Sequence, residues 1–357
     1  MKKKKATSRA AKRTTMTLLC VMLGLVLVLM LGATVYVEYL LNQMNYLGAD
    51  ETQPYLSQDE ADQLAMQETD PHDPDFTGPQ LRDEDVEFAD TDDIKIGGGK
   101  DVVNILLIGQ DSRTTKGQGR SDSMMLCTFN KVQKTITVTS FMRDMYVQIP
   151  GYKNNRINVA YMYGGMELLN ETLEKNFGLH IDGNVEINFK HFAKLIDMVG
   201  GIELELSGPE ANSINKNYTK GKLSAGKNLL NGTQALWYAR TRKVNSDGQA
   251  GDFGRTNRQR IVLQTLINKY KDSSLTDLVG MLDDVLPMIT TDLSKSEIIS
   301  YVMEFFPMLA DVKIINQRIP VEGSYDMVMI DGNSVLRVNF NKNIQVLMKS
   351  LEDGGVG

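Results

Sequence analysis

Two carboxylates and three arginines lie within one stretch of the chain, from Asn104 to Asp144. Asp111 and Asp122 follow the apolar run VVNILLIG, and Arg113, Arg120 and Arg143 lie in the same region. Mg²⁺ takes one or two carboxylates together with phosphate oxygens, and arginine forks bind phosphate oxygens in pairs. The combination predicts a metal-assisted phosphate site, although a capped turn with a local salt bridge would use the same residues.

A second basic motif, NGTQALWYARTRK, begins at Asn231. Asn231 is a suitable N-cap for a short helix. Arg240 and Arg242 stand two residues apart, a spacing that points them to different sides of a helix but to one side of an extended chain. We therefore predict that the helix ends near Arg240 and that both arginines can serve one ligand.

A third basic motif, GDFGRTNRQR, opens a longer helical pattern. Asp252 is placed to cap a helix that starts near Gly254. Arg255, Arg258 and Gln259 then share one face of its first turns, at the end of the helix that favours anions. A solvated basic helix face is the alternative interpretation of this motif.

Strand-like and helical segments interleave from residue 100 onward, which is typical of a layered α/β domain with helices on both faces of a sheet. The predicted strands are 102–108, 123–129, 135–140, 144–149, 201–206 and 312–319. The predicted helices are 165–176, 189–199, 231–239, 255–271, 275–286, 294–309 and 340–352.

The N-terminal region divides into three parts. Residues 1–14 form a basic tail, and 15–37 carry no charge over a length that can cross a bilayer of about 30 Å. The positive-inside rule places the tail in the cytoplasm and everything beyond Glu38 outside. Residues 38–99 are strongly acidic and predict a disordered extracellular spacer that holds the domain, 100–357, away from the membrane.

The composition excludes several site classes. Cys20 lies in the apolar N-terminal run and Cys127 in a strand-like run, so no disulfide framework is indicated. The three histidines, His72, His180 and His191, lack metal-ligand spacing, and a Ser-His-Asp or zinc hydrolase is not indicated. The net charge of −6 comes from the acidic region before residue 98 and leaves the rest near neutral, so the arginine clusters stand out.

Taken together, these motifs resemble the LytR-CpsA-Psr family of cell-envelope proteins. The resemblance is close over residues 100–272, looser to 357, and is carried by NILLIGQDSR, RSDSMML, SFMRDMYVQIPG, RINVAYMYGG, DMVGGIELEL, LNGTQALWYARTR and GDFGRTNRQR. It implies a central mixed β-sheet sandwiched between helices, with a hydrophobic pocket for a polyprenyl tail, after a single N-terminal transmembrane helix.

The resemblance also implies an activity. Members of the family are phosphotransferases that move a teichoic acid or capsular polysaccharide from undecaprenyl pyrophosphate onto peptidoglycan, at the C6 hydroxyl of N-acetylmuramic acid. By motif position Asp111 and Asp122 would hold Mg²⁺ (or Mn²⁺), and Arg143 would lie closest to the chemistry. The residues that would contact the pyrophosphate are Arg113, Arg120, Arg240, Arg242, Arg255 and Gln259.

Two other functions use the same residues. A polyprenyl-pyrophosphate hydrolase would replace the sugar hydroxyl with water. A membrane-anchored binding or regulatory module would bind the lipid pyrophosphate without turnover. The expected extracellular position of the domain argues against nucleic acid as a partner and favours membrane lipid and peptidoglycan. Asp144 and Asp252 are both hypotheses for the base.

Overall fold

The computed structural model describes residues 36–47, 56–60, 78–110, 121–217, 222–246, 248–270 and 285–352. Asp111, Arg113 and Arg120 lie outside these ranges, as does nearly all of the predicted membrane span 15–37. Within the described ranges, no helix combines the length and the apolar character that crossing a membrane requires.

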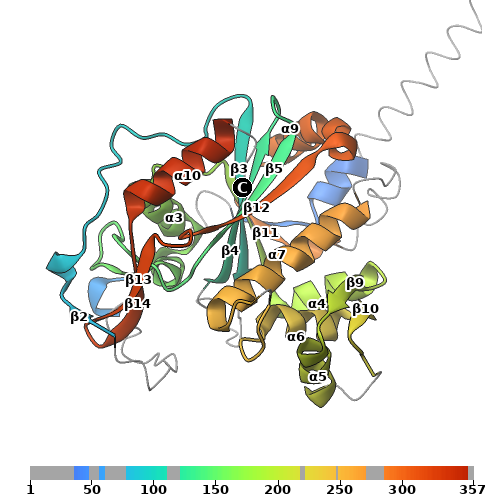
Figure 1. Ribbon diagram of the computed structural model, residues 1–357. Coiled ribbons are helices and arrows are strands. Elements are labelled where there is room, and N and C mark those ends of the chain that lie inside the picture. The colour runs from blue at the N-terminus through green and yellow to red at the C-terminus, as the bar shows by residue number, and fades with distance from the viewer. Residues whose placement is uncertain are drawn as a thin grey trace, which may run out of the picture.

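A seven-stranded mixed sheet forms the centre of the molecule (Figure 1), with strand order β1-β11-β8-β3-β4-β5-β12. β3, β4 and β5 form an antiparallel meander, while β8 is parallel to β3 and β12 is parallel to β5. The strands are β1 (Asn45–Tyr46), β3 (Val102–Gln110), β4 (Ser121–Asn130), β5 (Thr135–Phe141), β8 (Gly183–Asn188), β11 (Thr290–Thr291) and β12 (Lys313–Ile319).

Helices cover both faces of this sheet, which confirms the predicted architecture. On one face lie α3 (Ile157–Phe177) and α10 (Phe340–Glu352). On the other lie α4 (Phe189–Met198), α6 (Gly232–Arg240) and α7 (Gly251–Tyr270). Successive strand residues point to opposite faces, so Leu106 packs against the α3 side and Leu107 faces the α7 side.

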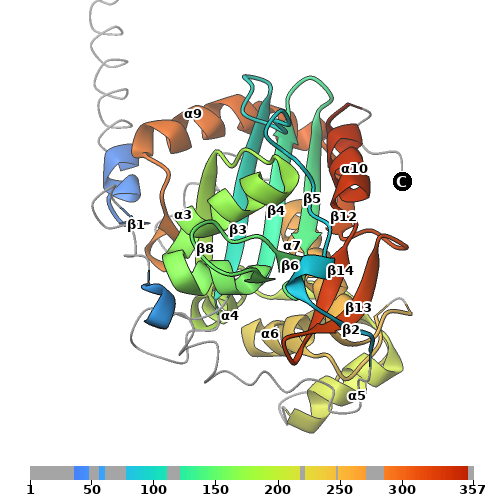
Figure 2. The same cartoon turned by 90° about the vertical axis from the view of Figure 1, so that its left-hand side faces the viewer.

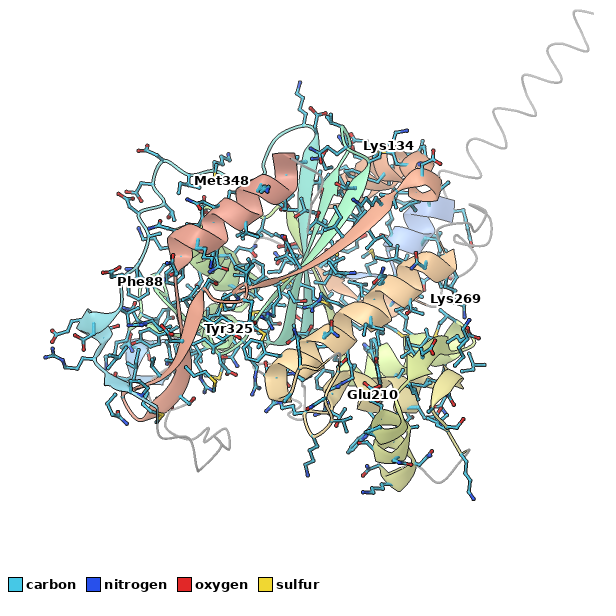
Figure 3. All side chains as sticks on the ribbon, viewed as in Figure 1. Phe88, Lys134, Glu210, Lys269, Tyr325 and Met348 are labelled. Atoms are coloured by element: carbon cyan, nitrogen blue, oxygen red, sulfur yellow. The ribbon has the colours of Figure 1, made fainter. Side chains whose placement is uncertain are left out.

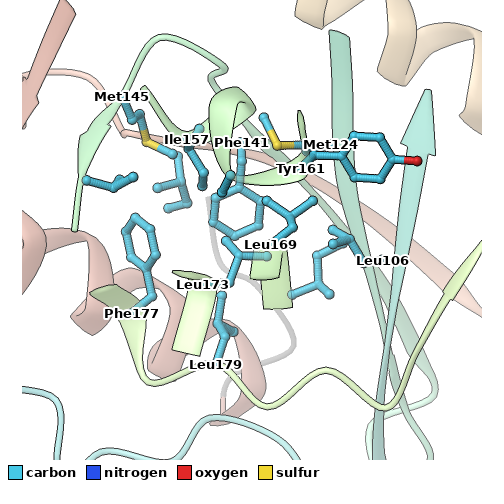
Figure 4. Close-up of a cluster of buried hydrophobic side chains, with 14 of the residues drawn as sticks. Leu106, Met124, Phe141, Met145, Ile157, Tyr161, Leu169, Leu173, Phe177 and Leu179 are labelled. Atoms are coloured by element: carbon cyan, nitrogen blue, oxygen red, sulfur yellow. The ribbon is translucent and has the colours of Figure 1, made fainter. Parts of the chain in front are cut away.

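The largest core lies between the sheet and α3 (Figure 4). Phe177 of α3 packs against Phe141 of β5 and Phe340 of α10, with ring centroids 5.6 and 5.4 Å apart. The helix begins at Ile157, earlier than the predicted 165. Gly164 and Gly165 have non-helical backbone angles, so a kink separates the first helical segment from the predicted one. The periodicity of the sequence is broken there, which hid the first segment.

Smaller units surround the central layers (Figure 2). The antiparallel pair of β9 (Ile202–Leu206) and β10 (Gly226–Leu230), with the intervening α5 (Gly208–Asn217), packs against α4, α6 and α7. The predicted strand 201–206 therefore exists but lies outside the main sheet. The predicted strand 144–149 shrinks to β6 (Tyr146–Val147), which pairs with β7 (Asn155–Arg156).

The chain after β11 forms a helical segment and then contributes two strands to a small second sheet. α9 (Lys295–Phe305) runs into η3 (Phe306–Asp311), as the helical pattern at 294–309 predicted. A three-stranded sheet joins β14 (Asn333–Val338), β13 (Tyr325–Ile330) and β2 (Gln80–Leu81). The predicted helix 275–286 lies almost wholly outside the described residues, and only η2 (Leu286–Met288) is seen after it.

The structure differs from the expectation of an unbroken spacer over 38–99. Residues 36–41 are helical and bury Leu40 and Leu41. β1 then joins the edge of the main sheet by pairing with β11. Residues 78–99 also pack on the domain, and Ile96 is buried there. The acidic composition concealed these contacts, because a few well-placed apolar side chains are enough to fix an extended segment.

Candidate active site

Strand register brings Asp122 and Arg143 together. In the antiparallel pair of β4 and β5, Met124 lies opposite Phe141. Asp122 lies two residues before Met124 and Arg143 lies two residues after Phe141, so the same antiparallel register sets them face to face. Nη1 of Arg143 donates a hydrogen bond to Oδ1 of Asp122 at 3.0 Å.

The start of α7 adds a second acidic and basic pair to this point. Asp252 and Arg255 stand one turn apart, with Nη2 of Arg255 2.7 Å from Oδ1 of Asp252. Nη2 of Arg255 also donates to the backbone carbonyl of Asp122 at 3.3 Å. Oδ1 of Asp252 lies 3.6 Å from Nε of Arg143. The two arginines and two aspartates thus form one continuous group.

Two further arginines and one aspartate extend this group. Nε of Arg242 lies 3.4 Å from Oδ1 of Asp252. Oδ1 of Asp144 lies 3.6 Å from Nε of Arg143 and 3.5 Å from Nη1 of Arg156. We call the whole set the arginine–aspartate network: Arg143, Arg156, Arg242, Arg255, Asp122, Asp144 and Asp252. Its four cations exceed its three carboxylates, which suits a site for an anion.

Burial strengthens the interactions between the charges of the network. The side chains of Arg143 and Arg255 are only 8 % and 5 % exposed, while that of Arg242 is more open. Burial lowers the pKa of Arg255, and the nearby charge of Asp252 opposes this shift. Burial also raises the pKa of Asp144, against the effect of Arg143. Interactions between charges are stronger in such a desolvated site than in water.

The sequence predicted Asp252 as the cap of a helix, and this prediction is wrong. α7 begins at Gly251, where φ is +58°, so Asp252 already lies in the first helical turn. Its carboxylate turns toward the arginines, and both of its oxygens are buried without a hydrogen bond of good geometry. The role of the side chain is therefore electrostatic.

Arg258 was expected beside Arg255 on the ligand-facing side, and this prediction is wrong. Its side chain is fully buried, and it donates to the backbone carbonyls of Thr241 and Val244. Its Nη1 lies 3.6 Å from Glu210. Arg258 fastens α7 to the segment after α6, and it does so away from the network.

An apolar cavity of about 230 Å³ lies beside the network, between the sheet and α4, α6 and α7. Its polar lining residues are Ser123, Arg240 and Gln259. Each is close in sequence to a network member, since Ser123 follows Asp122 and Gln259 stands one turn after Arg255. The apolar lining includes Leu107, Met125, Phe189, Phe192, Val262 and Leu266.

The end of α6 places Arg240 at the cavity, and the extended residues after it place Arg242 at the network. The helix is capped by Asn231, whose side chain accepts from the backbone N–H of Gln234, and it ends at Arg240, as predicted. The guanidinium of Arg240 stacks 4.3 Å from the centroid of the Phe189 ring at the cavity wall. Thr241 is extended, and Arg242 turns to the network. The two arginines therefore flank the junction of cavity and network.

Six of the nine site residues predicted from the sequence can be located. Asp122, Arg143, Arg242 and Arg255 belong to the network, and Arg240 and Gln259 line the cavity. Asp111, Arg113 and Arg120 lie outside the described residues. Arg156 was missed as a site residue, although the RINVAYMYGG motif contains it. Its position depends on the short pairing of β6 with β7, and the sequence predicted a strand over 144–149 but no partner strand at 155–156.

The described residues fit a metal ion only in combination with further ligands. In the described part of the chain, no group of three or more His, Cys, Asp or Glu side chains could hold one. Asp122 and the buried oxygens of Asp252 are hard donors of the kind that Mg²⁺ prefers. Both flank Arg255, so a cation bound with a phosphate would find carboxylate oxygens on this side.

The chain is similar in sequence to proteins of one family. The sequence profile of the LytR_cpsA_psr family matches residues 67–352. Regulatory protein MsrR of Staphylococcus aureus (strain COL) is 32 % identical over 258 residues, covering 70 % of this chain and 75 % of MsrR. The polyisoprenyl-teichoic acid–peptidoglycan teichoic acid transferase TagT of Bacillus subtilis (strain 168) is 34 % identical over 221 residues, covering 60 % of this chain and 66 % of TagT.

The fold is similar to solved structures of TagT. TagT bound to LIIa-WTA superposes with a TM-score of 0.57 at 29 % identity, over 76 % of this chain and 98 % of the other. YwtF (TagT) with bound octaprenyl pyrophosphate lipid superposes with a TM-score of 0.53 at 26 % identity and the same coverage. Since the family profile spans most of the sequence and the fold matches, the chain belongs to the LytR-CpsA-Psr family.

Proposed function

We propose that the protein transfers an anionic glycopolymer, of the teichoic acid or capsular polysaccharide type, from a polyprenyl-pyrophosphate carrier onto peptidoglycan. The observation that carries this proposal is the apolar cavity that adjoins the arginine–aspartate network. An amphiphile with a long apolar chain and a diphosphate head matches both parts. The teichoic acid transferase TagT and its structure with bound octaprenyl pyrophosphate support the same substrate class.

The polyprenyl chain would lie in the cavity and the diphosphate on the network. Arg240 and Gln259 stand at the junction, where the first phosphate meets the chain. Arg143, Arg242 and Arg255 supply fork-shaped donors for the phosphate oxygens. We propose that Arg113 and Arg120 complete this set.

The reaction is an in-line displacement at phosphorus. A peptidoglycan hydroxyl oxygen forms a bond to the phosphorus that carries the glycopolymer, and the bond from that phosphorus to the bridging oxygen breaks. Polyprenyl phosphate leaves with the bridging oxygen. Phosphoryl transfer depends on positioning and charge stabilisation, which buried arginines such as Arg143 and Arg255 provide.

The hydroxyl proton must go to a base. Asp144 and Asp252 are the two network carboxylates that we propose for this role. Burial raises the pKa of Asp144, which brings it closer to that of an effective proton acceptor at neutral pH. Asp252 lies between three arginines, a position better suited to holding them in place.

A magnesium ion completes the proposal. Asp122 and Asp111 would hold Mg²⁺ (or Mn²⁺), and the bound ion would neutralise charge on the diphosphate. We further propose that residues 15–37 anchor the protein in the cell membrane with its N-terminus in the cytoplasm, so that the site meets peptidoglycan outside.

The test uses the full chain in detergent with a polyprenyl-pyrophosphate-linked saccharide, Mg²⁺ and peptidoglycan oligomers. We expect saccharide on the glycan, and its loss with EDTA and with Asp122→Asn. Release of saccharide phosphate without labelled glycan would instead indicate a hydrolase. Tight binding of the lipid without turnover would indicate a regulatory module, in line with the name of MsrR.

A further inference from the structure

Exposed apolar side chains concentrate at one end of the molecule. Within the described residues, six of the nine large hydrophobic residues that are exposed belong to three neighbouring elements. They are Tyr36 and Tyr39 on the helical segment 36–41, Val132 in the β4–β5 turn, and Ile299, Val302 and Met303 on α9. We call this surface the apolar end. Val132 and Met303 are 75 % and 71 % exposed.

Polar contacts join the three elements into one surface. Nζ of Lys295, at the start of α9, lies 3.1 Å from Oε1 of Glu38. At the other end of α9, Lys131 pairs with Glu304 and lies 5.5 Å from the centroid of the Phe305 ring. α9 therefore bridges the segment 36–41 and the β4–β5 turn.

The exposed residues of α9 point in one direction. Ile299, Val302 and Met303 are spaced i, i+3 and i+4, which places them on one side of the helix. Phe305 is buried against the sheet, and the centroid of its ring lies 4.9 Å from that of Phe129. The helix thus uses one side for the core and turns a second apolar side outward.

The apolar end and the active site lie at opposite ends of the sheet (Figures 1 and 2). Lys134, in the β4–β5 turn, and Glu210, in the lobe below the active site, mark this separation in Figure 3. β3 spans nine residues between the two ends, which corresponds to roughly 30 Å.

The chain leads from the predicted anchor straight into this surface. The uncharged run ends at residue 37, and the segment 36–41 already buries Leu40 and Leu41 in the domain. No linker separates the two. A domain fastened at this point must lie against the surface from which the anchor emerges, whatever the length of the acidic region that follows.

We propose that the apolar end rests on the outer leaflet of the membrane, with Tyr36, Tyr39 and the outer side of α9 at headgroup level. This placement depends on the anchor of the proposed function. Tyrosines favour the membrane interface, and a concentration of exposed apolar side chains marks an interaction site. The active site then faces away from the bilayer, at about the height of the sheet.

The cavity extends from the network toward the apolar end, as this placement requires. Its lining runs along α7 from Gln259 to Leu266, about 10 Å at 1.5 Å per residue. It continues to Ile289, directly before β11, and β11 pairs with β1 next to the segment 36–41. A polyprenyl chain would therefore extend from the network toward the side of the domain that faces the bilayer.

The test places a fluorophore on the full chain in vesicles of phosphatidylcholine and phosphatidylglycerol. In a Cys20→Ser background, Met303→Cys carries the dye and Leu229→Cys serves as the control, since Leu229 is 64 % exposed on β10 in the opposite lobe. Cys127 is buried, and burial raises its pKa to about 12, so it does not react. Lipids with a quencher in the upper acyl chain report contact.

We expect strong quenching at position 303 and little at position 229. Equal, weak quenching at both positions in protein that floats with the vesicles would overturn the docking while leaving the anchor intact. Protein that fails to float would remove the anchor and the docking together. If the dye at position 303 is shielded from water but not quenched by the lipids, and this shielding increases with protein concentration, the surface instead binds a second copy of the chain.

An activity measurement separates this inference from the proposed function. We expect Met303→Glu to lower transfer from a vesicle-borne donor about tenfold, and to leave transfer from a detergent-solubilised donor unchanged. Leu229→Glu should leave both unchanged. If wild-type protein is inactive in detergent, the proposed function fails, whereas the quenching result stands by itself. Unchanged vesicle activity in Met303→Glu would contradict the docking.

Discussion

Arg143 is the residue on which the network converges. Its guanidinium lies within 3.0 to 3.6 Å of three carboxylates, those of Asp122, Asp144 and Asp252. A phosphate oxygen that enters the network would replace part of these contacts. The arginine is held in place before the substrate arrives, so little reorganisation accompanies the reaction.

Arg143→Ala should lower kcat of the transferase roughly 100- to 1000-fold, because the developing charge on the phosphate loses a positioned donor. Single-turnover kinetics with a lipid-linked saccharide would measure the effect. Arg337→Ala is a matched control, since Arg337 forms an exposed ion pair with Asp326. Activity within twofold of wild type in Arg143→Ala would remove Arg143 from the mechanism.

The buried pair of Glu186 and Tyr161 allows a prediction about pH. The Tyr161 hydroxyl donates to the carboxylate of Glu186, and burial raises the pKa of Glu186 above its ordinary value while this bond opposes the shift. A raised pKa in the folded state favours the protonated form. The protonated Glu186 therefore contributes to the free energy of unfolding at low pH. This contribution is lost as the pH rises through the pKa that Glu186 has in the folded protein.

Glu186→Gln should consequently unfold at a higher temperature than wild type at pH 8, and the difference should shrink toward pH 4.5. The amide can still accept from Tyr161 but carries no charge. Thermal unfolding across this range in one detergent measures the effect. A constant difference at all pH values would show that the ionisation of Glu186 does not contribute.

At the residue level, the sequence could indicate the type of site but not each partner. Asp122, Arg143 and Arg255 were found because their types suit a phosphate site, and the structure brings them together. Arg258 has the same type and spacing, yet its partners are Glu210 and two carbonyls from a different part of the chain. Only the tertiary structure separates a structural arginine from a binding one.

α7 carries both a structural arginine and residues of the candidate site. Arg255 and Gln259 face the network and the cavity, while Arg258 holds the segment after α6. Burial lowers the pKa of Arg258, and Glu210 opposes this shift. Removing one partner of a buried ion pair leaves the other without compensation, at a cost of about 3–5 kcal/mol.

Arg258→Met should therefore lower the free energy of unfolding by about 3–5 kcal/mol, measured by chemical denaturation. Gln259→Ala, one residue further along α7, should change it by about 1 kcal/mol or less while weakening binding of the lipid pyrophosphate. If Arg258→Met is as stable as Gln259→Ala, the fastening role of Arg258 is wrong.

Long elements with clear patterns were predicted well, and short polar ones were not. β3 and β4 each contain an apolar run, β5 is rich in β-branched residues, and α6 has the expected cap. β8 reads GNVEIN and lies half-buried, so its pattern is weak although it sits next to β3 in the sheet. β13 and β14 form a hairpin of mixed character, and their pairing depends on contacts that no local pattern records.

The whole molecule combines a packed core on one side of the sheet with a cavity on the other. Residues such as Leu107 and Val262 line the cavity, but their composition is the same as that of a core. The sequence therefore predicted the layered fold, while the location of the cavity required the structure. A family resemblance could imply a pocket without naming its walls.

Ala239→Phe should fill part of the cavity, because Ala239 is a small residue in its wall. We expect at least a tenfold loss in affinity for a polyprenyl pyrophosphate and no change for inorganic pyrophosphate, which needs only the network. Isothermal titration with both ligands checks this. Equal losses for both would mean that the substitution disturbs the network rather than the cavity.

The two-residue strand β1 has a practical consequence for handling the protein. It covers the edge of β11, and β2 does the same for β13. A shortened chain that starts at residue 100 would lack both strands and would leave unpaired backbone groups along two sheets. Such edges pair with those of neighbouring molecules, so this fragment should self-associate, whereas a fragment that starts at residue 36 should stay monomeric.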